Sequence, residues 1–442
     1  MPLRPRGRCS LVTLRLAVSM GAVQTAVSMV LSFLSIKVTS VYLGPAGIGT
    51  LSQLTYFTLL AQSIIAAGVH TGLVRRTAQL ANDAPGRARV VSTVLRGFLV
   101  AGMLTAGVIA VGSDWIAVAL LHDISLNLSL KIYAAVFVFG LVAAAITATA
   151  NGAQDFRGLT VVNVGTALSA FGLMVGLAPL YGLGGALVAT AALPLVTFSI
   201  AWAVARKRAW WPSKPFSHGF SMKEARSVVA FVPLAVISSV GLPLLQLLIR
   251  DDVAAASGMG AVGFLQGVVR ISDMYLGIAG TLFAMYYFPR FSEIDTADEL
   301  VNELLRGVLA IVPLAASAGL LIYLLRDWVV RFIFTAEFFP MRDLFGWQMA
   351  GNTLKMLSWL FGYVLLAKAN AYLLAALEIA TIFVWWLLSV YFIGIDGAVG
   401  ATRAYTLTYA AYSVATIAGV SLVVRGMRNQ ERIKRTTGAD DA

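Results

Sequence analysis

Long hydrophobic runs recur from one end of the chain to the other, and only short polar segments separate them. A helix needs about 20 mainly apolar residues to cross the hydrocarbon core of a bilayer. The runs reach this length, and no polar stretch between them is long enough to form a separate soluble domain. The pattern predicts an all-α polytopic membrane protein with about twelve transmembrane helices. The predicted spans cover about residues 10–36, 46–74, 90–112, 131–150, 157–178, 183–205, 229–250, 259–288, 303–324, 344–367, 371–394 and 397–424.

The longest polar connection lies near the middle of the chain and separates two sets of six predicted spans. It covers residues 206–226 and contains prolines, tryptophans and many cations. Two short segments also repeat. G-L-G-G-A-L-V-A-T at 182–190 resembles G-I-D-G-A-V-G-A-T at 394–402, and A-G-I-G-T-L at 46–51 resembles G-A-V-G-F-L at 260–265. Two lobes around a central cavity are a transporter architecture. We expect an N-terminal six-helix lobe at 1–205, a cytoplasmic linker at 206–228, a C-terminal six-helix lobe at 229–424 and a basic cytoplasmic tail at 425–442.

Composition supports a membrane location, because 59% of the residues are hydrophobic and only 12% are charged. The net charge of +12 would also suit binding to a nucleic-acid backbone. However, the cations gather in short loops and tails, as expected where Lys and Arg fix the orientation of a membrane protein from its cytoplasmic side. We therefore predict no nucleic-acid partner and place both termini in the cytoplasm.

The sequence lacks the motifs of common enzymes and cofactor sites. It contains no G-x-x-x-x-G-K-[ST] phosphate loop and no G-x-S-x-G nucleophile elbow. A single cysteine, Cys9, excludes an internal disulfide, and three histidines spread along the chain argue against a zinc site. We therefore predict a transporter rather than an enzyme, with no catalytic residue, metal or cofactor. Energy would come from an ion gradient, the membrane potential or the gradient of the substrate.

Five cations lie inside predicted spans, where a charge at the bilayer centre costs roughly 3 kcal/mol on insertion scales. Arg15, Arg96 and Arg403 are within about two turns of a span end, so their side chains can reach the interface. Arg270 and Lys355 lie near mid-span. Cations at this depth are expected to face the interior of the helix bundle.

Further polar side chains share helical faces with these two cations or lie on neighbouring spans. Together they predict a polar cavity wall with an excess of positive charge, which suits phosphate oxygens. In an alternative interpretation, Arg270 and Asp273, on one face of their span, only neutralise one another, and the amides join neighbouring helices. Arg250 shares a face with one of these amides. The uncharged members of the set are Gln24, Gln53, Tyr56, Gln62, Gln246, Gln266, Gln348 and Asn352.

Four segments in spans two, eight and ten and in their flanks share a recognisable pattern. They are G-P-A-G-I-G at 44–49, V-G-F-L-Q-G-V-V-R-I-S-D-M-Y-L at 262–276, M-R-D-L-F-G-W-Q-M-A-G-N-T-L-K at 341–355 and F-G-Y-V-L-L-A-K-A at 361–369. This pattern resembles the Wzx polysaccharide flippases, and within them the branch that serves enterobacterial common antigen. The likeness follows the chain nearly from end to end. It places the chain in the superfamily of multidrug, oligosaccharidyl-lipid and polysaccharide exporters.

The resemblance implies a bacterial inner-membrane flippase that moves an undecaprenyl-diphosphate-linked oligosaccharide to the periplasmic leaflet by alternating access. The cargo would be a repeat unit of O-antigen, common antigen or exopolysaccharide. The protein would act as a monomer among membrane lipids, beside glycan polymerase and chain-length regulator proteins. Arg270 departs from the family pattern, where a small polar residue is expected. The residues in matching stretches are Gln266, Asp273, Arg342, Asp343, Gln348, Lys355 and Lys368.

We expect cations to hold the diphosphate, uncharged polar residues to face the sugars, and Asp273 to balance Arg270 or to couple transport to protons. Two other functions remain open. One is a drug/cation antiporter of the same superfamily, which should prefer an acidic site, and the other is a non-transporting scaffold for glycan assembly. The expected diphosphate ligands are Lys355, Arg270, Arg15 and Arg403, and the expected gate or lobe contacts are Arg342, Asp343 and Lys368.

Overall fold

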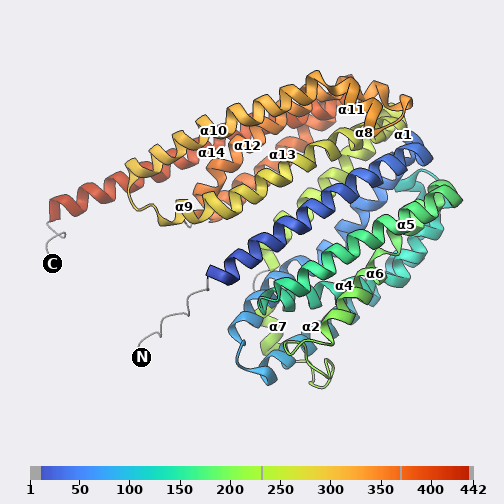
Figure 1. The fold of residues 1–442 in the computed structure, drawn as a ribbon, viewed down its shortest axis with the longest axis horizontal. Helices are drawn as coiled ribbons and strands as arrows, with labels where there is room; N and C mark the ends of the chain where they lie inside the picture. The colour runs from blue at the N-terminus through green and yellow to red at the C-terminus, as the bar shows by residue number, and fades with distance from the viewer. Residues whose placement is uncertain (1–10, 230–231, 369–370, 438–442) are drawn as a thin grey trace. The chain divides into compact units, whose positions relative to one another are not determined.

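A computed structural model describes residues 11–229, 232–368 and 371–437, and in these ranges every regular element is helical (Figure 1). The fold is therefore all-α, as predicted. The helices are α1 (Leu11–Gln79), α2 (Ala84–Val111), α3 (Ser113–Ile116), α4 (Asn127–Gly152), α5 (Phe156–Ala191), α6 (Leu193–Ala205), α7 (Met222–Val229), α8 (Val232–Leu282), α9 (Phe288–Glu293), α10 (Ala297–Leu324), α11 (Arg326–Ile333), α12 (Phe345–Ala367), α13 (Ala371–Asp396) and α14 (Ala398–Thr437), with short π- or 3₁₀-helical segments at Ala117–Leu121, Ile124–Leu126, Phe283–Tyr287 and Ala336–Leu344.

Single glycine residues divide three of the longest helices in two. Gly44 in α1, Gly182 in α5 and Gly258 in α8 have φ values of 63°, 56° and 79°. This left-handed region is one that glycine adopts without steric cost. In α8 the two halves lie side by side after the break, because Arg250 in the first half hydrogen-bonds to Gln266 in the second. A glycine thus serves as the whole connection between two helices.

Eight helices of the described chain are long and apolar enough to cross a membrane. Three of them are the helices that a glycine divides. When each divided helix is counted as two spans, with α6 completing the second span of α5, and α12 is added, the twelve predicted ranges are recovered. The predicted number of transmembrane helices is therefore confirmed.

The positive φ values also show how the two halves of the sequence correspond. Gly44 and Gly258 occupy equivalent places, just before the first pair of matching segments. In the second pair, the positive φ falls on Gly182 in the first half but on Gly397, between α13 and α14, in the second. The sequence match instead pairs Gly182 with Gly394, which lies inside α13. That match is out of register with the backbone, because small residues recur on both sides of the turn.

The chain forms two compact units. Unit 1 comprises Met1–Tyr42 and Phe57–Val240, and unit 2 comprises Leu43–Tyr56 and Gly241–Ala442. The middle of α1 therefore belongs to unit 2, where it packs closely on α8. A Cβ atom on Gly263 would overlap the Pro45 carbonyl, so glycine is needed for this approach.

Unit 1 has a hydrophobic core made by α2, α4 and α6 together with the second half of α1. Tyr133 and Phe137 of α4 are fully buried in it, and so is Leu95 of α2. The two rings meet edge to face, with centroids 5.6 Å apart. Burial of such large side chains supplies much of the packing energy of a helical unit.

The predicted linker folds onto unit 1. Trp211 packs into the hydrophobic core, and Trp210 Nε1 donates a hydrogen bond to Asp155 Oδ2 (2.9 Å). Farther along, Glu224 of α7 pairs with Arg76 near the end of α1 (3.1 Å between Nε and Oε2). These contacts tie the mid-chain segment to the ends of α1 and α5.

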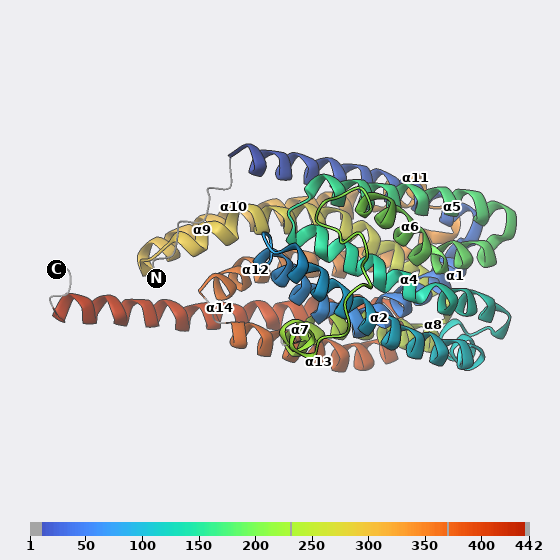
Figure 2. The same ribbon diagram turned by 90° about the horizontal axis from the view of Figure 1, so that it is seen from below.

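Unit 2 is organised around α12, which packs against α10 and α14. Its core includes the fully buried rings of Phe283 and Phe291 and the side chain of Leu360. Phe283 stacks on Tyr363 of α12, with centroids 5.7 Å apart. Figures 1 and 2 show that the C-terminal part of α14 continues as one helix far beyond the start of α13.

Candidate functional site

Arg250, in the first half of α8, is a fully buried cation. Its guanidinium donates hydrogen bonds to the side-chain oxygens of Gln246 and Gln266, each at 2.5 Å. The ring of Tyr56 from α1 covers it, with the ring centroid 4.0 Å from Cζ. A cation removed from water needs such partners. Arg250 therefore joins the two halves of α8 to the middle of α1.

The sequence indicated Tyr56, Gln246 and Gln266 as cavity residues that face sugars. In the structure all three contact Arg250, and Gln266 is only 7% exposed. This geometry favours the alternative interpretation, in which amides join helices inside the bundle.

A second polar group is centred on Asn352 of α12, which is fully buried. Its Nδ2 donates a hydrogen bond to Ser272 Oγ of α8 (2.8 Å), and its Oδ1 accepts one from the Tyr405 hydroxyl of α14 (2.7 Å). Gln348, one turn earlier, donates to the same Oδ1 at 3.4 Å. One satisfied amide thus fixes α12 to α8 and α14.

Lys355 follows Asn352 by about one turn of α12 and is half-buried. Its ammonium lies over three aromatic rings, 5.4 Å from the centroid of Trp359, 5.8 Å from Tyr405 and 5.2 Å from Tyr409. Within the described ranges, no carboxylate or hydrogen-bond acceptor lies within bonding distance of Nζ. Aromatic faces stabilise a cation but do not neutralise it. The Lys355 charge therefore remains available to an anion.

Asp273 on α8 lies within electrostatic range of three cations, Lys355, Arg250 and Arg270. We call these four residues the cationic cluster. Asp273 is exposed and Arg270 half-buried, and neither forms a direct ion pair or hydrogen bond with another described residue. They do not make the close pair that their spacing permits. Three cations around one carboxylate leave the cluster with an excess of positive charge.

Two further residues were expected to bind the diphosphate. Arg403 of α14 pairs with Asp396 (2.5 Å between Nη1 and Oδ2) and lies over the ring of Trp347, so a carboxylate already compensates its charge. The side chain of Arg15 lies outside the described residues. The structure thus brings Lys355 and Arg270 together around Asp273, but not Arg403.

The residues expected at a gate make local contacts within unit 2. Arg342 and Asp343 are exposed neighbours, 3.7 Å apart between Nε and Oδ1. Lys368 Nζ donates a hydrogen bond to the carbonyl of Ile294, just after α9. Their part in a gate stays a prediction.

The remaining amides do not join the cationic cluster. Gln62 belongs to unit 1, and Gln24 is half-buried in the same unit. Gln53, in the part of α1 that belongs to unit 2, is fully buried, and neither of its amide atoms has a hydrogen-bond partner in the described chain.

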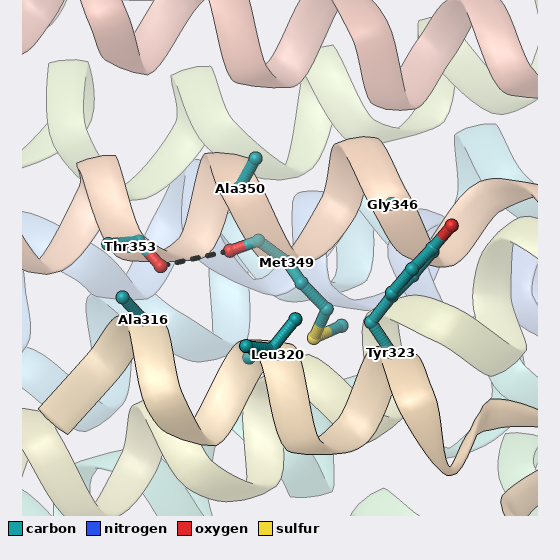
Figure 3. A pocket seen from close by; sticks show the side chains of 8 residues that line it. Ala316, Leu320, Tyr323, Gly346, Met349, Ala350 and Thr353 are labelled. Carbon is teal, nitrogen blue, oxygen red and sulfur yellow. Dashed lines mark hydrogen bonds between the residues drawn. The ribbon is translucent and has the colours of Figure 1, made fainter. Parts of the chain in front are cut away.

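A groove of about 400 Å³ lies between α10 and α12 (Figure 3). The Met349 and Leu320 side chains extend into it, and the Tyr323 ring borders one end. None of its lining residues is charged, so the groove does not extend the cationic cluster. The lining residues are Ala316, Gly319, Leu320, Tyr323, Gly346, Met349, Ala350 and Thr353.

The sequence reasoning did not select Arg250 or the three rings around Lys355 as site residues. Arg250 lies at the end of a predicted span, but α8 continues to the break at Gly258. The spacing of Tyr405 and Tyr409 on one helical face was a usable signal. Aromatic residues are so frequent in membrane helices that this signal is weak.

In a comparison with known families, the family described as "Polysaccharide biosynthesis protein" matches residues 17–295. A curated relative, the "Lipid III flippase" of Escherichia coli (strain K12), is 28% identical over 403 residues, which cover 88% of this chain and 94% of that protein. These matches confirm the resemblance that the four sequence segments indicated.

Solved structures show the same fold at low sequence identity. The inward-facing conformation of a multidrug resistance MATE family transporter of the MOP superfamily has a TM-score of 0.75 and 14% identity, covering 91% of this chain and 96% of that chain. The lipid II flippase MurJ, in an inward closed conformation, has a TM-score of 0.71 and 13% identity, covering 90% and 87%. The chain therefore shares its fold with these two proteins.

Proposed function

Because this chain belongs to the polysaccharide biosynthesis protein family, we propose that it is a flippase for a glycan linked to undecaprenyl diphosphate. It moves the glycan from the cytoplasmic to the periplasmic leaflet of a bacterial inner membrane, by alternating access and as a monomer, with both termini in the cytoplasm. Glycan polymerase and chain-length regulator proteins use the product. The lipid III flippase activity in the name of the curated relative supports this class of substrate.

The observation that carries the proposal is the Lys355 ammonium, a membrane-embedded cation that forms no direct ion pair or hydrogen bond with a described residue. A charge inside a membrane without a direct ion pair is costly and is usually functional. A diphosphate supplies the missing negative charge through charge-assisted hydrogen bonds. Lys355 and Arg270 contact the phosphate oxygens, and the fully buried Arg250 adds a fixed positive potential.

Flipping of a labelled lipid-linked oligosaccharide in liposomes tests this function directly. Lys355→Met should lower the rate about tenfold or more, because a hydrogen bond to a charged group contributes roughly 1.5–3 kcal/mol. Lys355→Arg should retain part of the rate, since it keeps the charge. Lys131→Met is the matched control, because this exposed lysine pairs with Asp114 in unit 1.

Each alternative has its own outcome. If Lys355→Met flips the substrate at an unchanged rate and equal protein level, the proposal that Lys355 binds the diphosphate is wrong. Uptake of a cationic drug with no glycan movement would identify an antiporter, and no movement of either by the unmodified protein would leave only a scaffold.

A further inference from the structure

Glu378 is a carboxylate inside a membrane-crossing helix and apart from the cationic cluster. It lies on α13, within the apolar stretch Leu373–Asp396, and its side chain is half-buried. It borders a pocket of about 350 Å³ formed by α8, α12, α13 and α14 of unit 2. The pocket is lined by Gly280, Ser358, Trp359, Gly362, Tyr363, Leu366, Leu374, Glu378 and Tyr412.

The Glu378 carboxylate has no ion pair or hydrogen bond with the described residues. An unpaired carboxylate in an apolar helix is costly when charged. It therefore requires a proton or a bound cation for at least part of the time that it spends in the membrane.

The pocket lining favours a proton over a metal ion. Its other oxygen atoms on side chains belong to Ser358, Tyr363 and Tyr412, and Ser358 Oγ already donates to the Lys355 carbonyl (2.7 Å). In the described part of the chain, no three acidic, histidine or cysteine side chains gather in a metal-binding group. One carboxylate among phenol hydroxyls provides too few oxygen ligands for a stable metal site but is sufficient for a single proton.

Aromatic rings connect this pocket to the cationic cluster. Trp359 lines the pocket and also lies under the Lys355 ammonium, 5.4 Å away. On α14, Tyr412 lines the pocket, its ring centroid is 6.2 Å from that of Tyr409, and Tyr409 lies 5.2 Å from the same ammonium. Two paths of aromatic rings therefore connect the pocket of Glu378 to the Lys355 ammonium. One path is Trp359 alone, and the other is Tyr412 followed by Tyr409.

We propose that Glu378 is a proton-binding site that couples transport to a proton gradient through the aromatic rings of Trp359, Tyr409 and Tyr412, which lie between Glu378 and Lys355. Protonation removes one negative charge beside Tyr412 and Tyr363, the titratable groups that α14 and α12 present to it, while α8 presents only Gly280. A change in the packing of Trp359 and Tyr409 then alters how firmly they hold Lys355 away from the diphosphate. The inference rests on the proposed flippase function and assigns its driving ion.

Flipping with and without a pH gradient tests the coupling, in liposomes of phosphatidylethanolamine and phosphatidylglycerol that contain a pH dye. One pH unit changes the protonated fraction of a carboxyl group by up to about tenfold. A pH gradient should therefore increase the flipping rate of the unmodified protein severalfold. Addition of substrate should also change the pH inside the liposomes, as the dye reports. Glu378→Gln should lose both responses. Glu293→Gln, at an exposed carboxylate of α9, should keep both.

A second measurement does not depend on transport. A hydrophobic carbodiimide reacts with protonated carboxyl groups, so mass spectrometry should find an adduct at Glu378 that declines as the pH rises. No adduct at any pH would overturn the proton site.

The failures of the two proposals are distinguishable. If the flipping rate of the unmodified protein does not change with a pH gradient, or changes with a sodium gradient instead, the role of Glu378 is overturned. The flippase function would remain intact. No flipping by the unmodified protein would overturn the flippase function and the coupling with it, whatever the carbodiimide result.

Discussion

The cations beside the linker in unit 1 and the cations of the cationic cluster in unit 2 have different surroundings. In unit 1 the arginines near the linker find acceptors: Arg76 pairs with Glu224, Arg208 with Asp155, and Arg96 donates to the carbonyl of Phe216. In unit 2, Arg250 donates its hydrogen bonds to neutral groups only and its Nε has no partner, and Lys355 and Arg270 have no direct acceptor among the described residues.

The difference separates two uses of positive charge in one membrane protein. Paired arginines at helix ends hold the mid-chain segment in place, and carboxylates or carbonyl groups of the protein compensate their charge. The cations inside helices keep a positive electrostatic potential that Asp273 offsets only in part and that an anionic ligand can neutralise. If this distinction holds, substitutions in unit 1 should change stability locally, and those in the cationic cluster should change transport, with Arg250 contributing to both.

The largest expected effect on stability comes from Arg250→Met. The substitution leaves the amides of Gln246 and Gln266 without their shared donor inside the bundle. The free energy of unfolding should fall by about 3 kcal/mol or more, in the range seen when one partner of a buried charged group is removed. Thermal unfolding in detergent, followed by size-exclusion chromatography, measures the loss. Arg342→Met is the control, because that arginine is exposed; equal stability of the two variants would contradict the role of Arg250.

The next largest effect is expected for Asp155→Ala. Asp155 caps the first turn of α5 through Gly158 N (2.9 Å), and it accepts from Trp210 Nε1 and pairs with Arg208 of the linker. Loss of the cap and of a part-buried hydrogen bond should destabilise unit 1 by about 2 kcal/mol. Trypsin should then cut the linker faster than in the unmodified protein.

Asp83→Ala provides a matched control for that prediction. Asp83 caps α2 in the same manner, through Gly86 N (2.8 Å), but no hydrogen bond or ion pair joins its carboxylate to the linker in the described chain. Its removal should cost the cap alone, about 1 kcal/mol. Equal linker cleavage in both variants would show that Asp155 does not fasten the linker.

A smaller effect is expected for Tyr405→Phe, which removes the hydrogen bond to Asn352 Oδ1 and keeps the ring over Lys355. Stability should fall by about 1 kcal/mol, and flipping should weaken because α12 is less firmly held. Tyr409→Phe is the comparison, since its ring also lies over Lys355 but its hydroxyl has no hydrogen bond in the described chain. Denaturant titration of both variants should separate the hydroxyl from the ring. A larger loss in Tyr409→Phe would be the opposite of this expectation.

The smallest effect should follow Asp298→Asn. The pair between Asp298 and Arg428 (3.0 Å) is well exposed, with side-chain exposures of 81% and 56%. Exposed pairs of this kind contribute roughly 0–1 kcal/mol, so the change in melting temperature should be within error. A clear shift would mean that pairing at the surface of unit 2 matters as much as pairing in unit 1.

The span pattern could be predicted from the sequence because hydrophobic length is dictated by the bilayer. The turns were predicted only in place. Gly182 and Gly258 lie inside the predicted connections 179–182 and 251–258, but the sequence did not show that one glycine makes the whole turn. The predicted end of one span at residue 250, just before Asp251 and Asp252, falls eight residues before the turn. This error made Arg250 look like a residue at a helix end.

The candidate site was predicted in part. Lys355 and Arg270 were identified because a charge inside an apolar run is conspicuous in any sequence. Their surroundings depend on which helices are neighbours, and that information is tertiary. Arg403 differs from them, because its partner Asp396 lies only seven residues earlier, at the end of α13, and the pair forms across the turn to α14.

The glycine turns also decide where this protein can be modified experimentally. At Gly44, Gly182, Gly258 and Gly397 one residue connects two helices, so an inserted epitope or fluorescent tag has no loop to enter and would separate helices that must touch. The exposed stretch around Ser213, Lys214 and Gly219 offers room for such a tag. Topology mapping of this protein should therefore label helix ends by single-cysteine chemistry and keep insertions for the linker.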